Sequence, residues 1–200
     1  MPVTLPSDLP IELFATSAAW QKWLAAHPDA PGVWLKIAKK NTTGHNQAVT
    51  SVSYADALDV ALCHGWIDGL KRSCDAQYFL QRFTPRRPRS LWSKINVAKV
   101  EQLLVAGRMA EAGLREVEAA KADGRWQAAY DSASNMEVPL ELASALAKNA
   151  KARKCFEQLD KVNRYAFCWR VQTAKKPETR QARVEKFIAM LARGDKIHAP

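Results

Sequence analysis

The sequence has no apolar run long enough to cross a membrane and no motif of a familiar nucleotide-binding or hydrolase site. Nowhere do about 18 consecutive apolar residues occur, and the opening MPVTLPSDLP lacks a basic start followed by an apolar stretch. We therefore expect no transmembrane segment, no signal peptide and a cytoplasmic location. Neither GxxxxGK[ST] nor GxSxG is present, so the sequence indicates neither a P-loop nor a serine nucleophile elbow.

Cysteine is scarce and histidine is scattered. A chain of 200 residues can fold without disulfides, and no CxxC spacing is present, so we expect reduced thiols. The histidines are too dispersed to predict a metal site, and nothing predicts a cofactor. The residues concerned are Cys63, Cys74, Cys155 and Cys168, and His27, His45, His64 and His198.

Acidic residues are outnumbered, with 20 against 30 basic residues, which gives a net charge of +10. Such a charge favours anionic partners such as nucleic acid, nucleotides, phosphorylated metabolites or an acidic membrane face. Because the basic residues occur in both halves of the chain, plain solubility is an equally good explanation of the charge alone. A hydrophobic content of 48% and a charged content of 25% predict a folded, soluble chain.

The N-terminal half predicts a small antiparallel sheet between helices. One helix is capped by Thr16 or Ser17 and ends near His27, and the pair Ser53 and Asp56 is typical of a second helix start. Alternation predicts strands at 33–39, with one buried face, and at 77–84, which we expect to pair. The WIDG segment, 66–69, is predicted to be a tight turn because glycines flank it.

The C-terminal half predicts helices almost throughout. A helix starting at Ser90 or Ser93 is followed by one at 114–123, and further helices lie beyond Pro139. Pro177 and Gly194 suit the two ends of the last helix. The fold class is therefore α+β and mainly α-helical: a small antiparallel sheet covered by helices, with a C-terminal helical part. We expect an N-terminal part at 1–124 and a C-terminal part at 139–200, joined by 125–138, or a single domain.

Polar, basic and aromatic side chains are dense between Cys63 and Asn96. From Lys71 to Lys99 there are eight basic residues, Arg72 among them, against the acid Asp75. In TPRRPRS, prolines stiffen a loop of arginines just before a helix start, where hydroxyls and backbone N–H groups suit a phosphate or carboxylate. The candidate ligand-binding residues are Trp66, Asp68, Tyr78, Arg82, Thr84, Arg86, Arg87, Ser90, Trp92, Ser93 and Asn96.

Asp68 is the candidate catalytic residue. Flanked by Trp66 and facing Arg82 or Arg86, it would form an oriented ion pair in a cleft, although a purely structural role is slightly favoured. Its spacing from His64 would suit an acid–base pair on one helix face, but Gly65 and Gly69 predict that the helix ends first.

These motifs resemble the bacterial YdeI/OmpD-associated family, also described as bacteriocin-protection proteins. The resemblance runs from about Trp34 to Gly194 and is carried by VWLKIAKK, YADALDVALCHGWIDG, YFLQRFTPRRPRSLWSKIN, GRMAEAGL, AAKADGRWQAAYD and NRYAFCWRVQTAKKPETRQARV. It implies a bacterial cytosolic protein associated with envelope stress or tolerance of antimicrobial peptides. It supplies no catalytic residue.

Three functions follow as hypotheses. The leading one is a non-enzymatic binding protein whose basic cleft takes an anionic small molecule or an acidic protein or lipid surface. The alternatives are a nucleic-acid-binding protein, with Trp92 stacking beside the arginines, and an enzyme that uses Asp68 as acid or base on an anionic substrate.

Overall fold

The computed structural model describes residues 5–39 and 50–198. The chain divides into two compact units, the first formed by Met1–Leu91 and Asn96–Ala128, the second by Trp92–Ile95 and Ala129–Pro200. Over the described residues it has eight helices and four strands, with the C-terminal part helical, so the predicted α+β class is confirmed. The domain boundaries at 124 and 139 stay a prediction.

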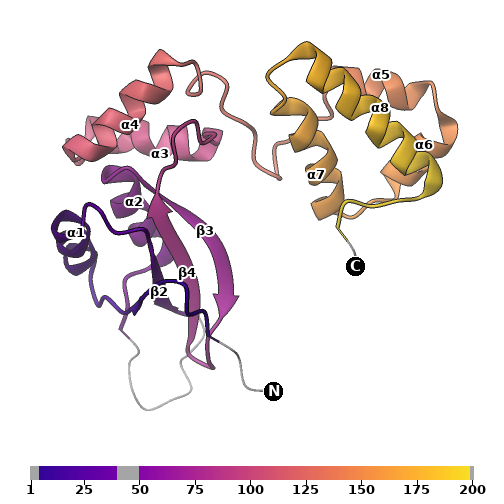
Figure 1. The fold of residues 1–200 in the computed structure, drawn as a ribbon. Helices are drawn as coiled ribbons and strands as arrows, with labels where there is room; N and C mark the ends of the chain where they lie inside the picture. Colours follow the sequence, from indigo (N-terminus) through magenta and orange to yellow (C-terminus); the bar gives the residue numbers. More distant parts are fainter. Residues whose placement is uncertain (1–4, 40–49, 199–200) are drawn as a thin grey trace. The chain divides into compact units, whose positions relative to one another are not determined.

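A four-stranded sheet organises the first unit (Figure 1). Its strands are β1 (Ile11–Glu12), β2 (Val33–Ala38), β3 (Trp66–Ser73) and β4 (Tyr78–Pro85), in the order β1-β2-β4-β3. The predicted pairing is confirmed, because β2 and β4 are antiparallel, as are β4 and β3. The short β1 pairs parallel to β2, which makes the sheet mixed.

Helices α1 (Ser17–Ala26) and α2 (Tyr54–Cys63) cover one face of this sheet, which we call the inner face (Figure 1). Both begin at the predicted caps: Thr16 accepts a hydrogen bond from the Ala19 backbone, and Ser53 accepts one from that of Asp56. Trp20 lies at the centre of the core, with its ring 5.8 Å from that of Phe83. Aromatic side chains of the core therefore cover the inner face.

The opposite, outer face carries Trp34, Lys36, Tyr78, Leu80 and Arg82, since side chains alternate along paired strands. Trp34 is only 1% exposed, so the expectation of one buried face for β2 is wrong at this position. The reason is that the segment before β2 folds back, and its side chains pack against the cluster that Trp34 forms with Cys74 and Leu80. These partly buried residues are Leu9 and Ile11.

A second correction concerns WIDG, which is the start of strand β3 and not a turn. Pairing with β4 overrides the low strand propensity of aspartate and glycine here. Gly65, with φ 76°, makes the reversal that ends α2. Between Asp68 and Lys71 the register shifts, because the two residues between them oppose one residue of β4 in a β-bulge.

Helices α3 (Lys94–Val105) and α4 (Glu111–Ala122) follow the sheet. α3 begins just after Ser93, so Ser90 lies in the preceding loop, and α4 begins three residues earlier than the predicted Leu114. α4 packs on the end of α2, where the Ala110 backbone donates to the carbonyl of Cys63 over 3.0 Å.

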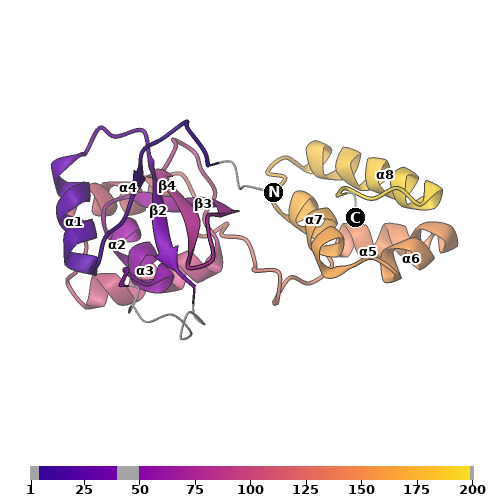
Figure 2. The ribbon, with the colours of Figure 1, turned by 90° about the horizontal axis from the view of Figure 1, so that it is seen from below.

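The second unit contains α5 (Leu140–Ala147), α6 (Ala150–Glu157), α7 (Lys161–Gln172) and α8 (Pro177–Arg193) (Figure 2). Pro177 and Gly194 occupy the predicted ends of α8. The core of the unit includes Phe167 and Phe187, whose rings meet edge to face at 5.0 Å.

Candidate functional site

The strand register separates the predicted site residues into different places. Trp66 and Asp68 lie on the inner face, where Trp66 is a core residue only 3% exposed. Tyr78, Arg82 and Thr84 lie on the outer face, by the alternation of β4. These five predicted site residues therefore lie on two different faces of the sheet and do not line a common cleft.

On the outer face, two guanidinium groups flank one indole ring. The guanidinium carbon of Arg72 lies 5.6 Å from the centroid of the Trp34 ring, and that of Arg82 lies 5.9 Å from it. Both distances are within the range of cation–π attraction. We call Arg72 and Arg82 the arginine pair.

One carboxylate, that of Asp8, lies beside the arginine pair and neutralises part of its charge. Its Oδ1 accepts a hydrogen bond from Nε1 of Trp34 at 2.9 Å, and its Oδ2 lies 3.4 Å from Nη2 of Arg82. The indole hydrogen bond, more than the charges of the two arginines, holds the pKa of Asp8 below its usual range. Arg72 makes no ion pair within the described residues, so the arginine pair has an excess of positive charge.

The surroundings of the arginine pair are also basic and aromatic. Nζ of Lys36 lies 5.5 Å from the centroid of the Tyr78 ring on the same face. Nε of Arg82 is buried and has no hydrogen-bond acceptor among the residues described. A buried donor without an acceptor is uncommon and is a place where an anion or water would add a bond.

Asp68 does not face the arginine pair. Its carboxylate accepts a hydrogen bond from the hydroxyl of Tyr54 at 2.7 Å, on the inner side of the sheet. Burial, followed by this hydrogen bond and the charge of Asp68, raises the pKa of Tyr54 well above its ordinary value. The bond ties β3 to the start of α2. An acid or base role for Asp68 stays a prediction.

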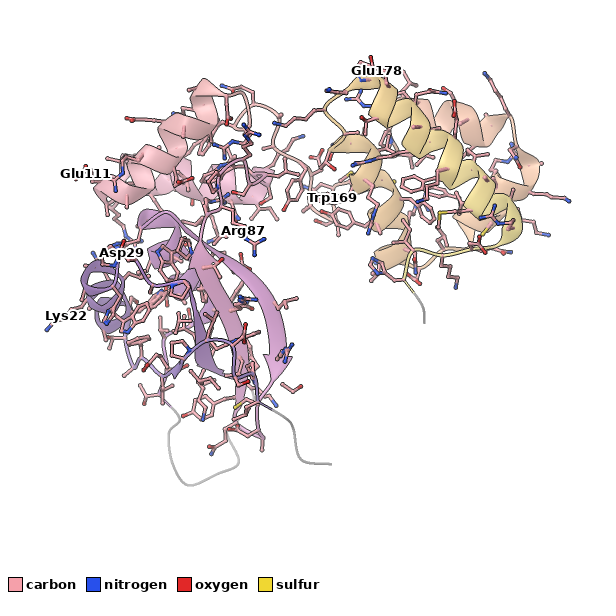
Figure 3. All side chains as sticks on the ribbon, viewed as in Figure 1. Lys22, Asp29, Arg87, Glu111, Trp169 and Glu178 are labelled. Atoms are coloured by element: carbon pink, nitrogen blue, oxygen red, sulfur yellow. The ribbon has the colours of Figure 1, made fainter. Side chains whose placement is uncertain are left out.

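In the TPRRPRS loop, the side chain of Arg86 is buried, whereas that of Arg87 is exposed. Arg86 is 6% exposed, and its Nη1 donates to the carbonyl of Leu91 at 3.3 Å. The Arg87 side chain extends from the chain just beyond β4 (Figure 3). The two neighbouring arginines therefore have different surroundings.

Arg125, which the sequence analysis did not single out, holds the same loop. It is 4% exposed, pairs with Asp123 at 2.7 Å and donates to the carbonyl of Ser90 at 3.0 Å. The hydroxyl oxygen of Ser90 is itself buried.

The remaining predicted ligand-binding residues, Trp92, Ser93 and Asn96, are divided between the two units. Trp92 and Ser93 fall in the second unit, where the Trp92 carbonyl accepts from the backbone of Tyr130 at 3.0 Å. Trp92 is only 2% exposed, whereas Asn96 lies in the first turn of α3, in the first unit. His64 ends α2, and burial lowers its pKa.

Asp8, Trp34 and Arg72 complete the site but were not among the predicted site residues. Arg72 was counted as part of the basic segment, and its position beside Trp34 depends on the bulge in β3. Over 5–39 and 50–198, no three histidine, cysteine or acidic side chains are arranged to hold a metal ion. No helix in the same residues is long and apolar enough to span a membrane.

Comparison with known families gives two matches. Residues 135–194 match the family described as bacteriocin-protection, YdeI or OmpD-associated, which confirms the resemblance for this part of the chain. Residues 12–116 match a domain of unknown function, DUF8412. No curated protein and no solved structure gives a significant match. Since 12–116 is more than half of the 200 residues, the chain belongs to the DUF8412 family and carries a C-terminal segment of the YdeI or OmpD-associated type.

Proposed function

We propose that the protein is a non-enzymatic binding protein whose outer sheet face takes an anionic ligand or an acidic partner. The observation that carries the proposal is the arginine pair around Trp34, with two guanidinium groups and one carboxylate. Guanidinium groups present fixed forks of N–H donors that match carboxylates and phosphates.

The charge of the whole chain supports the same proposal. A net charge of +10 attracts anions over a distance of about 8–10 Å at moderate salt and repels cations. Direct capture of a cationic antimicrobial peptide is therefore disfavoured. If the protein takes part in bacteriocin protection, as the family of its C-terminal segment suggests, recognition of an anionic partner explains the charge better.

The proposed site retains part of the predicted cleft. Tyr78, Arg82 and Thr84 share the outer face, and Arg72 and Lys36 join them. Trp66, on the inner face, and Arg86, just beyond β4, are buried, with exposed fractions of 3% and 6%, and lie outside the proposed site.

Isothermal titration with ATP, glucose 6-phosphate and phosphatidylglycerol vesicles tests the proposal. We expect at least one probe to bind, and Arg72→Ala with Arg82→Ala to weaken that binding by about tenfold or more, because a hydrogen bond to a charged group contributes about 1.5–3 kcal/mol. A control with the same net charge is Lys22→Ala with Arg115→Ala, at two exposed helix positions, and Lys22 points away from α1 in Figure 3. Equal affinities of the two double variants would overturn the proposal.

Nucleic-acid binding is the second candidate, favoured by Tyr78 and Lys36 beside the arginine pair. Trp34 is buried and cannot stack on a base, so this binding would depend mainly on phosphates. We expect the affinity for a single-stranded oligonucleotide to fall steeply as salt rises from 50 to about 200 mM. A flat salt response would exclude this candidate.

A further inference from the structure

A cavity of about 580 Å³ lies on the inner face, away from the arginine pair. It is lined by residues that include Ile37, Ala38, Ser53, Tyr54, Lys71 and Phe79, all in the first unit. The volume is within the range of about 300–1,000 Å³ typical of small-molecule sites. The sheet supplies apolar walls, and the start of α2 supplies the polar edge.

The β-bulge places Lys71 in this cavity. From Asp68 to Lys71 is three residues on β3, while their partners Phe83 and Gln81 are two residues apart on β4. The extra residue returns Lys71 to the face of Asp68, whereas regular alternation would have placed it on the outer face. Arg72 then falls on the outer face beside Trp34.

Lys71 has an aromatic neighbour and no ion-pair partner among the described residues. Its Nζ lies 4.1 Å from the centroid of the Phe79 ring, and it makes no ion pair or hydrogen bond within the described part of the chain. The hydroxyl of Tyr54, at the start of α2, donates a hydrogen bond to the carboxylate of Asp68, and its raised pKa keeps it neutral. Over 5–39 and 50–198, Lys71 is thus one of two cations that line a mostly apolar cavity; the other, Lys39, donates through Nζ to the carbonyl of Asp75 at 2.7 Å.

A mostly apolar cavity that contains a lysine without an ion-pair partner among the described residues is complementary to a molecule with an apolar body and one negative group. We propose that this cavity binds a small hydrophobic carboxylate, with its apolar body against Ile37 and Phe79 and its carboxylate on Nζ of Lys71. The site is independent of the proposed anion-binding face, since the two lie on opposite sides of β4.

Octanoate and benzoate are the probes, with octanol and benzyl alcohol as uncharged equivalents of the same size. In titrations of the full chain followed by amide NMR, we expect the acids to shift the signals of residues 37, 54, 71 and 79, and to bind about tenfold more tightly than the alcohols. Equal affinity for acid and alcohol, or shifts elsewhere only, would overturn the proposal.

Substitution of Lys71 tests how its charge contributes to binding, separately from the apolar walls of the cavity. Lys71→Met retains a chain of similar length, so we expect octanoate affinity to fall about tenfold and octanol affinity to stay within twofold. Lys22→Met, at an exposed position on α1, is the matched control and should change neither. If Lys71→Met leaves octanoate affinity unchanged, the proposal is wrong.

Two further variants keep the result unambiguous. Phe79→Trp adds bulk to the wall of the cavity from β4, because Phe79 lies on the inner face opposite Ile37, and should weaken binding of acid and alcohol alike. Arg72→Ala with Arg82→Ala should leave octanoate affinity unchanged, so that failure of the outer-face proposal is distinguishable from failure here. Loss of octanoate binding in this double variant would count against a separate site.

Discussion

The indole nitrogen of Trp34 donates a hydrogen bond over 2.9 Å to the carboxylate of Asp8. That carboxylate also pairs with Arg82, so a group from the chain itself occupies the position that an external anion would take. Asp8 therefore competes with any ligand of the arginine pair. Removal of the Asp8 charge should therefore raise the affinity for an anionic ligand, and this rise tests the proposed function.

We expect Asp8→Asn to increase the affinity for the tightest-binding of the three anionic probes by about three- to tenfold. The amide still accepts from the Trp34 indole, but it no longer neutralises Arg82. Asp29→Asn is the control, because it makes the same change in net charge at an exposed position (Figure 3). An equal effect of both substitutions in isothermal titration would show that only net charge matters.

Gly113→Ala should strongly destabilise the first unit. An added Cβ would lie 2.2 Å from the carbonyl oxygen of Cys63, so α4 and the end of α2 would have to separate. The gain in helix propensity is about 1 kcal/mol, and we expect the steric cost to exceed it, for a net loss of about 2–3 kcal/mol.

Urea unfolding measures the effect of this substitution. Gly107→Ala is the comparison: nothing lies within 4 Å of its added Cβ, so its cost comes only from the left-handed backbone at φ 64° and should be about 1 kcal/mol. A Gly113→Ala variant as stable as the natural chain would contradict the close packing of α4 on α2.

Asp131→Asn should lower stability more at neutral pH than in acid. The Lys94 ammonium is the largest cause of the lowered pKa of Asp131, and the Gln172 amide adds to it. An aspartate ordinarily titrates near 3.8, so its stabilisation is complete well above that pH and is lost as the pH falls through the lower folded-state pKa.

The expected deficit of Asp131→Asn is about 1 kcal/mol at pH 7, and it should be smaller at pH 2.5, where more of the carboxylate is protonated. Urea unfolding of both chains at the two pH values checks this. A deficit that is equally large in acid would mean that the substitution acts through packing and not through the carboxylate charge.

Phe167→Ala should loosen the second unit and leave the first intact. Phe167 is fully buried between Phe156 and Phe187, and truncating a buried phenylalanine costs about 3–5 kcal/mol. Hydrogen exchange followed by mass spectrometry should show faster exchange across 140–193 and unchanged exchange across 54–63 and 78–85. Uniformly faster exchange in both units would indicate a single cooperative domain.

Local signals in the sequence predicted most of the elements. The caps at Thr16 and Ser53, and the two ends of α8, depend on residues within one helical turn of each other, so the sequence shows them directly. Alternation was enough to predict that β2 pairs with β4. These contacts need no knowledge of distant partners.

The site could not be predicted in the same way, because it depends on contacts between distant residues. Trp34 is buried by a segment more than 20 residues earlier, and Arg125 reaches Ser90, which lies 35 residues away. The bulge in β3 changes which residues share a face, so clustered basic residues in the sequence belong to opposite sides of the sheet.

The bulge also affects how the protein meets other copies of itself. β3 is the last strand in the sheet order, and residues 69–73 are exposed, so its outer edge has backbone donors and acceptors that another strand could pair with. A bulged edge that carries Lys71 and Arg72 is a poor template for such pairing, because its hydrogen-bond row is interrupted and like charges repel. The extra residue of the bulge, which places Lys71 on the inner face, therefore also disfavours edge-to-edge aggregation of the sheet.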